Sequence, residues 1–488
     1  MTRGLTSDTL VTVAAIGIVS LALHAVAVSA ERAIFLNGLD FTAAGVHVAG
    51  DPRDLTRLLI DVASYGAAVL LLFGMYAWIL VLAGSGRLTG RARLTALVVP
   101  VALHVGLLSV RPYLSLDLFT YLAHGAQVVL LGVNPYTTPA SDLAATSYGR
   151  ELMALGWRPT IPVTPYGPLW TAIEVAVVTS ARDVTSGVVL MKAVAVCASL
   201  GSAALIWAIL GRVRPSARLT GTLAYLWNPM IIGELAGEGH NDAVMILLVL
   251  AALYAAVHVR WTSTIVMLGL AVAAKFLPAI FAPPLAALLW RQSGRRAARL
   301  RGAVVGLAAA SGITTLLFAP FWVGAGTFAG IGAGVETGTA FASTRWALLE
   351  LAGPAADAPV RIVVTLVFLG VTAVAAARVR DATGMLVSCA WIALAYVLVA
   401  TPYYWPWHAA LPVALMALSP GGVFRWMIVA LAAGSRLAAP LDDMFANGFI
   451  PLRAEAALTY VLAIGIPLLV LSAVALRGLR STTSAAPS

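Results

Sequence analysis

The stretch 291-RQSGRRAARLR-301 places five arginines between two apolar runs, near 276–290 and 302–322. Apolar runs of roughly 20 residues cross the ~30 Å hydrocarbon core of a bilayer, and we interpret both runs as spanning helices. Short loops rich in arginine stay on the cytoplasmic side of a membrane. This stretch therefore sets the orientation of the chain, and the other segments can be counted outward from it.

The composition is that of a membrane protein. Of 488 residues, 60% are hydrophobic and only 11% are charged, whereas a soluble domain carries roughly 25% charged residues. No polar block is long enough to fold as a separate soluble domain. The sequence predicts an all-α polytopic membrane protein with about 14 spanning helices in a single domain. These helices are expected near 11–30, 58–84, 94–110, 186–210, 220–235, 242–258, 262–275, 276–290, 302–322, 359–377, 383–400, 405–419, 424–440 and 456–476.

One further apolar stretch, 166-PYGPLWTAIEVAVVTS-181, is excluded from the spanning set. If it does not cross, nearly all dense basic loops fall on one side of the membrane. If it did cross, the loop at 291–301 would face outward, against the positive-inside rule. We therefore expect an outer-face helix packed against the bundle, and both termini in the cytoplasm of a cell-membrane protein.

The charge balance and the cysteines exclude several classes of protein. The net charge of +10 comes almost entirely from arginine. Arginine in the cytoplasmic loops explains this basic excess, so it does not indicate a nucleic-acid-binding protein. Cys197 and Cys389 lie in apolar runs, so they predict neither a disulfide nor a metal framework. The first run ends in 28-VSA-30, which loosely resembles a signal-peptidase site, but its length of about 20 residues favours an uncleaved anchor.

The predicted topology gathers the unusual polar and aromatic stretches on the outer face. If loops were simply polar, both sides would have similar content. The cytoplasmic loops instead hold arginine with glycine, serine and proline. The outer face collects 111-RPYLSLDLFTYLAHG-125, 132-GVNPY-136, 164-TPYGPLW-170, 237-GEGHND-242, 274-AKFLP-278, 341-FASTR-345 and 401-TPYYWPWH-408. We therefore expect a functional site on that face.

Asp117 begins the mixed stretch 117-DLFTYLAHGAQVVLL-131. Aspartate is a good helix N-cap, because its carboxylate accepts hydrogen bonds from the first backbone N–H groups. A carboxylate fixed at a helix N-terminus is also a positioned base whose pKa the helix dipole keeps low. Asp117 is therefore either a cap, a catalytic base, or both.

The stretch 237-GEGHND-242 contains four polar side chains, Glu238, His240, Asn241 and Asp242, at a helix start. One of them could cap the helix that follows, but four exceed what a cap needs, which favours binding. A metal site is the weaker alternative, because the spacing matches no metal signature.

Two cations are expected on the outer face. Lys275 ends an apolar run, where its ammonium either snorkels to the interface or holds a phosphate. Arg345 could bind phosphate through two parallel hydrogen bonds. The aromatic run nearby, Tyr404, Trp405 and Trp407 with His408, is either an interfacial belt or a surface that stacks on sugar rings.

The order of Asp117, 132-GVNPY-136, 164-TPYGPLW-170, 227-WNP-229 with 239-GHND-242, and 274-AKFLP-278 resembles the C-type (GT-C) glycosyltransferases. More narrowly, it is similar to the actinobacterial polyprenol-phosphomannose-dependent α-1,6-mannosyltransferases. The resemblance runs from about Leu94 to His408. It implies a GT-C fold with a core at 91–420, two additional helices within 1–90, C-terminal helices within 421–488, and active-site loops at 111–185, 236–242, 323–358 and 401–408.

The resemblance also implies a reaction and roles for these residues. Mannose would pass from polyprenyl-phosphate mannose to a mannan or lipoglycan acceptor, as in lipomannan-type cell-wall synthesis, with inversion, an Asp base and no cofactor or metal. Asp117 would be the catalytic base, although many relatives have two acidic residues there. Lys275, Arg345 and His240 would bind the donor phosphate. Sugar or acceptor would contact Tyr121, Tyr136, Tyr166, Glu238, Asn241, Asp242, Tyr404, Trp405, Trp407 and His408.

Two alternatives remain open from the sequence. The first is a transferase of the same fold for another polyprenyl-phosphate sugar, arabinofuranose or glucose. The second is a transporter or flippase of a lipid-linked sugar. Transporters often contain two similar halves with polar residues near the midplane. Here we find no such repeat, and the polar residues gather at one surface.

Overall fold

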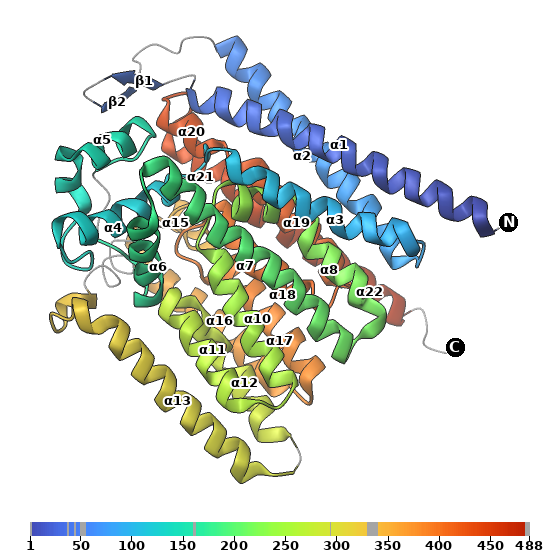
Figure 1. Ribbon diagram of the computed structural model, residues 1–488. Helices are drawn as coiled ribbons and strands as arrows, with labels where there is room; N and C mark the ends of the chain where they lie inside the picture. Colours follow the sequence, from blue (N-terminus) through green and yellow to red (C-terminus); the bar gives the residue numbers. More distant parts are fainter. Residues whose placement is uncertain are drawn as a thin grey trace.

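The computed structural model describes residues 2–36, 39–42, 45–48, 55–159, 163–292, 294–328 and 340–483 (Figure 1). It is a helical bundle with many long apolar helices, which confirms the all-α polytopic membrane class. Within the described ranges the only sheet is an antiparallel hairpin, β1 (Leu39–Thr42) and β2 (Gly45–Val48), between α1 (Thr2–Leu36) and α2 (Leu55–Gly84). The expected outer loop at 323–358 is described only in part, because 329–339 lie outside these ranges.

The other helices follow in chain order. They are α3 (Gly90–Gly106), α4 (Asp117–Leu131), α5 (Ser147–Ala154), α6 (Pro168–Ser180), α7 (Val184–Val213), α8 (Arg218–Leu226), α9 (Pro229–Ile231), the π-helix η4 (Ile232–Gly237), α10 (Asp242–Val257), α11 (Trp261–Ala274), α12 (Ala282–Arg291), α13 (Arg296–Phe318), α15 (Thr344–Ala352), α16 (Asp357–Ala377), α17 (Ala382–Ala395), the 3-10 helix η10 (Pro406–Ala409), α18 (Ala410–Met416), α19 (Val423–Ala438), α20 (Leu441–Ala446), α21 (Leu452–Tyr460) and α22 (Ile466–Thr483).

The expected number of about 14 spanning helices is too high by the criterion of length. Eight helices in the described part are long and apolar enough to cross a membrane, or nine if the pair formed by 229–237 and 242–257, bent by 116°, counts as one span. The other expected spans correspond to short or interrupted helices such as α11, α12, α18 and α19. Helices that are apolar on all sides are also typical of a buried core, so hydropathy alone counted them as spans.

The excluded stretch near 166–181 forms α6, a helix of 13 residues that is too short to span and packs against α4. In contrast, α1, α13 and α22 expose large apolar side chains such as Ile18, Leu316 and Leu469 along their length. Exposed apolar surface of this extent is expected where a protein faces lipid.

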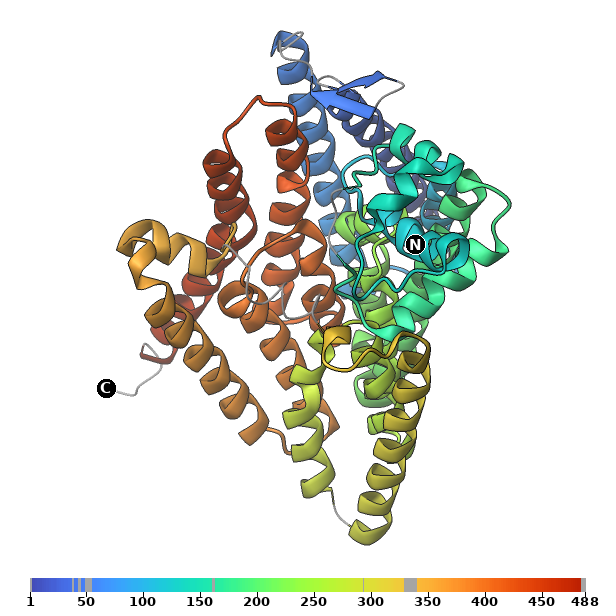
Figure 2. The ribbon, with the colours of Figure 1, turned by 90° about the vertical axis from the view of Figure 1, so that its left-hand side faces the viewer.

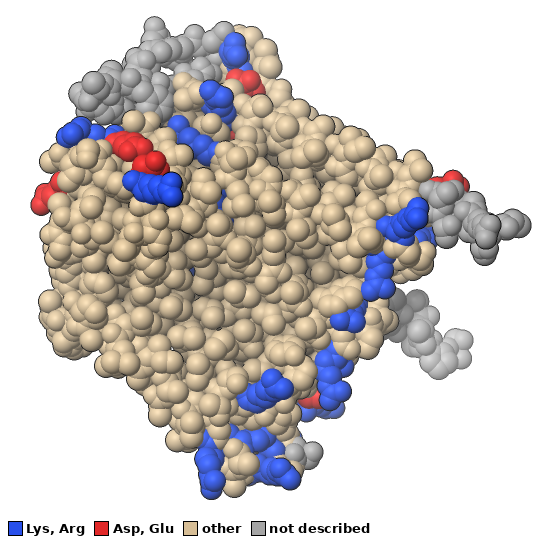
Figure 3. All heavy atoms as spheres, in the orientation of Figure 1, with Lys and Arg blue, Asp and Glu red and all other residues tan. Residues whose placement is uncertain are grey.

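The charged side chains divide the molecule into two polar ends. Figure 3 shows Lys and Arg in a row from the right edge to the bottom, separated by a wide uncharged surface from mixed basic and acidic side chains at the upper left. The start of α1 and the end of α22 lie on the side of the basic row, whereas α4, α5 and α20 lie at the opposite end (Figure 1). Figure 2 shows the orange and red helices of the C-terminal third beside the green and yellow helices that precede them.

Candidate active site

The loop that leads into α4 is held from both sides by buried charged side chains. Lys192 on α7 donates through Nζ to two carbonyls at the start of the loop, those of Leu107 and Val110. The carboxylate of Glu238 accepts hydrogen bonds from the three successive backbone amides of residues 113–115, at 3.0–3.4 Å. Glu238, expected to bind sugar, therefore fixes the segment that carries Asp117.

Asp117 does not cap α4. It is the first residue of the helix, the N-cap position belongs to Leu116, and no side-chain capping hydrogen bond is present there. The carboxylate instead accepts a hydrogen bond from the Tyr121 hydroxyl at 3.2 Å, and its Oδ2 lies 3.6 Å from Nδ1 of His240. Since the Asp117 side chain is 30% exposed, it combines fixed partners with an open face.

His240 lies fully buried between two carboxylates. Its Nδ1 faces Asp117, and its Nε2 lies 3.3 Å from Oε2 of Glu234 on η4. Gly239 precedes it with φ of +78°, in the left-handed region that glycine adopts without strain. This turn aims the imidazole at Asp117, so two stretches more than 120 positions apart in the sequence form one site.

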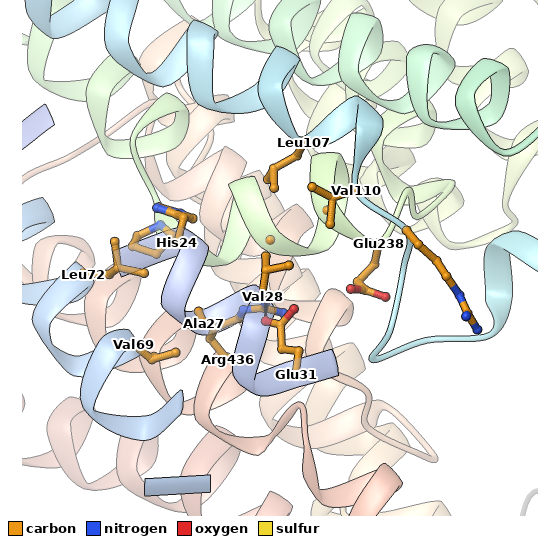
Figure 4. A pocket seen from close by; sticks show the side chains of 14 residues that line it. His24, Ala27, Val28, Glu31, Val69, Leu72, Leu107, Val110, Glu238 and Arg436 are labelled. Atoms are coloured by element: carbon orange, nitrogen blue, oxygen red, sulfur yellow. Dashed lines mark hydrogen bonds and ion pairs between the residues drawn. The ribbon is translucent and has the colours of Figure 1, made fainter. Parts of the chain in front are cut away.

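A buried ion cluster contacts the other carboxylate oxygen of Glu234. Arg436 on α19 pairs with Glu234 at 2.9 Å and also with Glu31 on α1. Figure 4 shows Arg436 and Glu31 at a cavity of about 20 Å³ that Glu238 also lines. Sequence reasoning missed this cluster, although an ionisable residue inside an apolar run is itself a signal of a buried functional group.

Aromatic rings cover the other side of His240. The Trp407 ring stacks on the imidazole at 4.0 Å between centroids, and Trp405 lies parallel to Trp407 at 5.6 Å. Phe341, which the sequence did not single out, continues the row beside Trp405 at 5.3 Å. His408 accepts the backbone N–H of Trp405 through Nδ1 at 3.4 Å and so holds the turn.

Lys275 and Asp242 form a second polar pair near this row. Nζ of Lys275 donates to Oδ2 of Asp242 at 2.8 Å, and the lysine side chain remains 21% exposed. The segment with Tyr166 reaches them because the Gly167 amide donates to the carbonyl of Ala274 at 3.1 Å. A Cβ at position 167 would lie 2.1 Å from a backbone oxygen, so only glycine fits there.

Tyr121 connects the two sides of the site. It packs edge-on against Tyr166 at 5.5 Å between ring centroids, and its hydroxyl reaches Asp117. Partial burial by itself raises the pKa of Asp117. The His240 imidazole, the ammonium of Lys275 and the Tyr121 hydroxyl outweigh burial and hold this pKa below its ordinary value.

Asp117 borders a cavity of about 220 Å³. Glu234, Trp405 and Trp407 line this cavity, and so do residues of the C-terminal helices α20 and α21. The lining side chains that could contact a ligand are those of Ser115, Asp117, Trp405, Trp407, Asp442, Glu455 and Thr459. The sequence did not single out Asp442, Glu455 or Thr459.

No described contact joins four other expected site residues to Asp117 or Lys275. Arg345 pairs with Asp357 at 2.6 Å, and no contact described in the structure joins it to Lys275. The Tyr136 hydroxyl bonds Thr171 at 2.9 Å, and the Tyr404 hydroxyl bonds Ser435. Asn241 is buried, and both polar atoms of its side chain have no hydrogen-bond partner. The sequence does not predict the partners of Arg345, Tyr136 and Tyr404, because each partner belongs to another helix.

Within the described residues, no group of three or more His, Cys, Asp or Glu side chains has the geometry to hold a metal ion. The arrangement provides the partly exposed carboxylate of Asp117, the partly exposed ammonium of Lys275 and a row of aromatic rings. Such a set can remove a proton, hold an anion and stack on a ring.

Comparison with known proteins gives a family match over more than half of the chain. Residues 2–292 match the family described as alpha-(1->6)-mannopyranosyltransferase, N-terminal domain. Alpha-(1->6)-mannopyranosyltransferase A of Corynebacterium glutamicum is 33% identical over 189 residues, 37% of this chain and 36% of the relative. The protein of the same name from Mycobacterium tuberculosis is 29% identical over 284 residues, 56% of this chain and 51% of the relative. The chain thus matches about half or less of the length of these relatives.

Proposed function

Because the chain belongs to the alpha-(1->6)-mannopyranosyltransferase family, we propose that it is a membrane mannosyltransferase. The donor is polyprenyl-phosphate mannose, the acceptor is a mannan or lipoglycan, and the new linkage is α-1,6. The observation that carries this proposal is Asp117, fixed by His240 and Tyr121 at the edge of a cavity walled by parallel tryptophans. The C-type fold expected from the sequence agrees with this assignment.

The reaction is an inverting displacement. An acceptor hydroxyl gives its proton to the carboxylate of Asp117 while its oxygen forms a bond to the anomeric carbon of the β-mannosyl phosphate. The bond from that carbon to the phosphate oxygen breaks, and its electron pair leaves with polyprenyl phosphate. Because phosphate leaves without protonation, the site needs a cation rather than a second acid.

The lipid part of the donor has a suitable surface beside Lys275. An open groove of about 900 Å³ lies between α11 and α13, with a lining that is mostly apolar. Phe276, next to Lys275 in the chain, lies at this groove, and Phe318, Trp322 and Phe328 line it further along. A polyprenyl chain along this groove would end near Phe276, the residue after Lys275, which supports Lys275 as the donor-binding cation.

Replacement of this cation is expected to weaken donor binding. Lys275→Met removes a charge-assisted hydrogen bond worth about 1.5–3 kcal/mol, so the KM for the donor should rise by roughly 10- to 100-fold. The acceptor KM should change little. Initial rates at varied donor and acceptor concentrations measure both constants, and Lys275→Arg is the control that keeps the charge. An unchanged donor KM in Lys275→Met would assign the phosphate to another residue.

The acid limb of the pH–rate profile is expected to report the environment of Asp117. Since the pKa of Asp117 is held below its ordinary value, the midpoint of the acid limb in wild-type kcat/KM should lie below the ordinary aspartate pKa of about 3.9. His240→Ala removes the two largest influences that lower this pKa, so the pKa of Asp117 should rise. The acid limb should then move to higher pH, so activity at pH 5–6 is lost first. An acid limb at the same pH in both proteins would exclude Asp117 as the titrating base.

The direction of the site relative to the membrane follows from the charge distribution. The basic row belongs to the cytoplasmic side under the positive-inside rule, and α4 and α20 lie at the other end (Figures 1 and 3). We therefore assign the site to the outer face of the cell membrane and both termini to the cytoplasm. Cysteine-labelling of single introduced thiols in whole cells tests this assignment.

A transfer assay tests the function. Purified protein in nanodiscs receives radiolabelled polyprenyl-phosphate mannose and a short α-1,6-mannoside, and extension of the mannoside is the expected result. Parallel reactions with arabinofuranosyl and glucosyl donors test the first alternative. Movement of the donor across vesicle membranes without sugar transfer would replace the proposal by the transporter alternative.

A further inference from the structure

The C-terminal helices α20 and α21 bring two carboxylates to the cavity that Asp117 borders. Asp442 lies on α20 and Glu455 on α21, and Thr459 follows one turn later on the same wall. All three lie outside the segment that matches the family, which ends at residue 292. The proposed reaction as described above gives none of them a role.

Glu455 is the unusual member of this group. Its side chain is only 2% exposed, and its Oε2 has no hydrogen-bond partner among the described residues. A buried polar atom without a partner costs free energy, so such an atom on a cavity wall indicates a ligand that donates a hydrogen bond. Asp442 is half-buried beside it and adds further acceptor oxygens.

The remaining lining selects the class of ligand. Trp405 and Trp407 present aromatic rings to the same cavity, and aromatic faces stack on the apolar faces of sugar rings. Carboxyl groups supply acceptor oxygens, and sugar hydroxyls are donors that match them. The volume of about 220 Å³ is below the roughly 300–1,000 Å³ typical of pockets for drug-sized ligands. The cavity therefore suits about one sugar ring.

We propose that Asp442, Glu455 and Thr459, with Trp405 and Trp407, form the subsite that holds the terminal mannose of the acceptor. This inference rests on the proposed function and assigns the acceptor, rather than the donor, to this cavity. The argument is positional: Asp117 must take its proton from the acceptor hydroxyl, and Asp117 borders this cavity, whereas Lys275 does not line it. In this arrangement donor and acceptor approach Asp117 from opposite sides.

Direct binding tests the subsite without any transfer reaction. Saturation-transfer NMR of an α-1,6-mannobioside on the purified full chain, without donor, gives the Kd for the wild type, Glu455→Gln and Asp442→Asn. Each variant keeps the size of the side chain but replaces one carboxyl oxygen by an NH2 group, so one hydrogen-bond acceptor is lost. Loss of one hydrogen bond should weaken binding by roughly 2- to 10-fold. The acceptor KM should rise by the same factor while the donor KM stays constant.

Glu350→Gln is the matched control. Glu350 lies on α15, pairs with Arg453 at the surface and does not line the cavity, so its variant should bind mannoside like the wild type. Thermal unfolding of each variant distinguishes weak binding from misfolding. If Glu455→Gln does not fold, Asp442→Asn alone tests the subsite.

The outcomes separate the subsite from the reaction. If the wild type transfers mannose but neither Glu455→Gln nor Asp442→Asn changes the acceptor Kd or KM, the subsite is overturned and the function stands. If the wild type transfers no mannose yet binds mannoside in a way that depends on Glu455, the reaction fails and the subsite stands. If a lost carboxylate raises the donor KM instead, the cavity holds the donor and the inference is wrong.

Discussion

Asp117→Asn is expected to lower kcat by about 10²- to 10⁴-fold, the range that a general base contributes. The amide keeps the shape of the carboxylate and can still contact Tyr121, but it cannot take the acceptor proton. The KM values for donor and acceptor should change much less, because the phosphate and the sugar rings are held by other groups. Steady-state rates with both substrates varied measure this difference.

The large effect is expected because the neighbouring acids are engaged elsewhere. Glu238 accepts three backbone amides, Glu234 faces His240 and Arg436, and Asp242 pairs with Lys275. Asp142→Asn, at an acid outside the cavity, serves as the control and should retain full activity. A folded Asp117→Asn protein with a wild-type kcat would leave Asp117 without a catalytic role and direct attention to Asp442 and Glu455.

Arg436→Met is expected to produce the largest loss of stability. Arg436 is 6% exposed, and its guanidinium pairs with both Glu31 and Glu234. Its removal takes the paired guanidinium from buried Glu31 and leaves Glu234 with the His240 contact. Breaking a buried pair in this way costs about 3–5 kcal/mol. The cluster also joins α1 to η4 and α19, so three distant segments lose a shared contact. Unfolding in a detergent titration with SDS measures the change in the free energy of unfolding.

Arg425→Met is the control on the same helix, because Arg425 is exposed at the start of α19. Its free energy of unfolding should stay near that of the wild type. Equal stability of the two variants would mean that the buried cluster contributes no net stabilisation, and that Glu31 and Glu234 are accommodated without Arg436.

The all-α membrane class follows from hydropathy, and the structure confirms it. The roles of the site residues remain predictions, but the structure brings several of these residues together. Asp117, His240, Lys275 and Trp407 come from separate stretches, and their order along the chain was enough to group them. Hydropathy also located the long spans, since each of the eight long apolar helices matches an expected span. It could not separate a spanning helix from a short buried one, because both are apolar on all sides, as α18 is.

The missed residues share a physical reason. Glu31, Glu234 and Arg436 lie inside apolar segments, where their partners are set by the packing of helices far apart in sequence. Glu455 and Asp442 belong to the C-terminal helices, which carry no recognisable motif, and only the cavity relates them to Asp117. Glu238 was expected to bind sugar because of its neighbours, and the sequence did not indicate that its carboxylate holds the loop before α4.

The most direct test of the proposed mechanism is the configuration of the product. NMR of the extended mannoside, made by the wild-type protein from a β-mannosyl phosphate donor, gives the configuration and position of the new linkage. The proposal of one carboxylate base and direct attack by the acceptor predicts an α-1,6 linkage, with inversion at the anomeric carbon. A β-linked product would show retention, which requires a nucleophile that bonds to the sugar, and would contradict the role of Asp117 as a base.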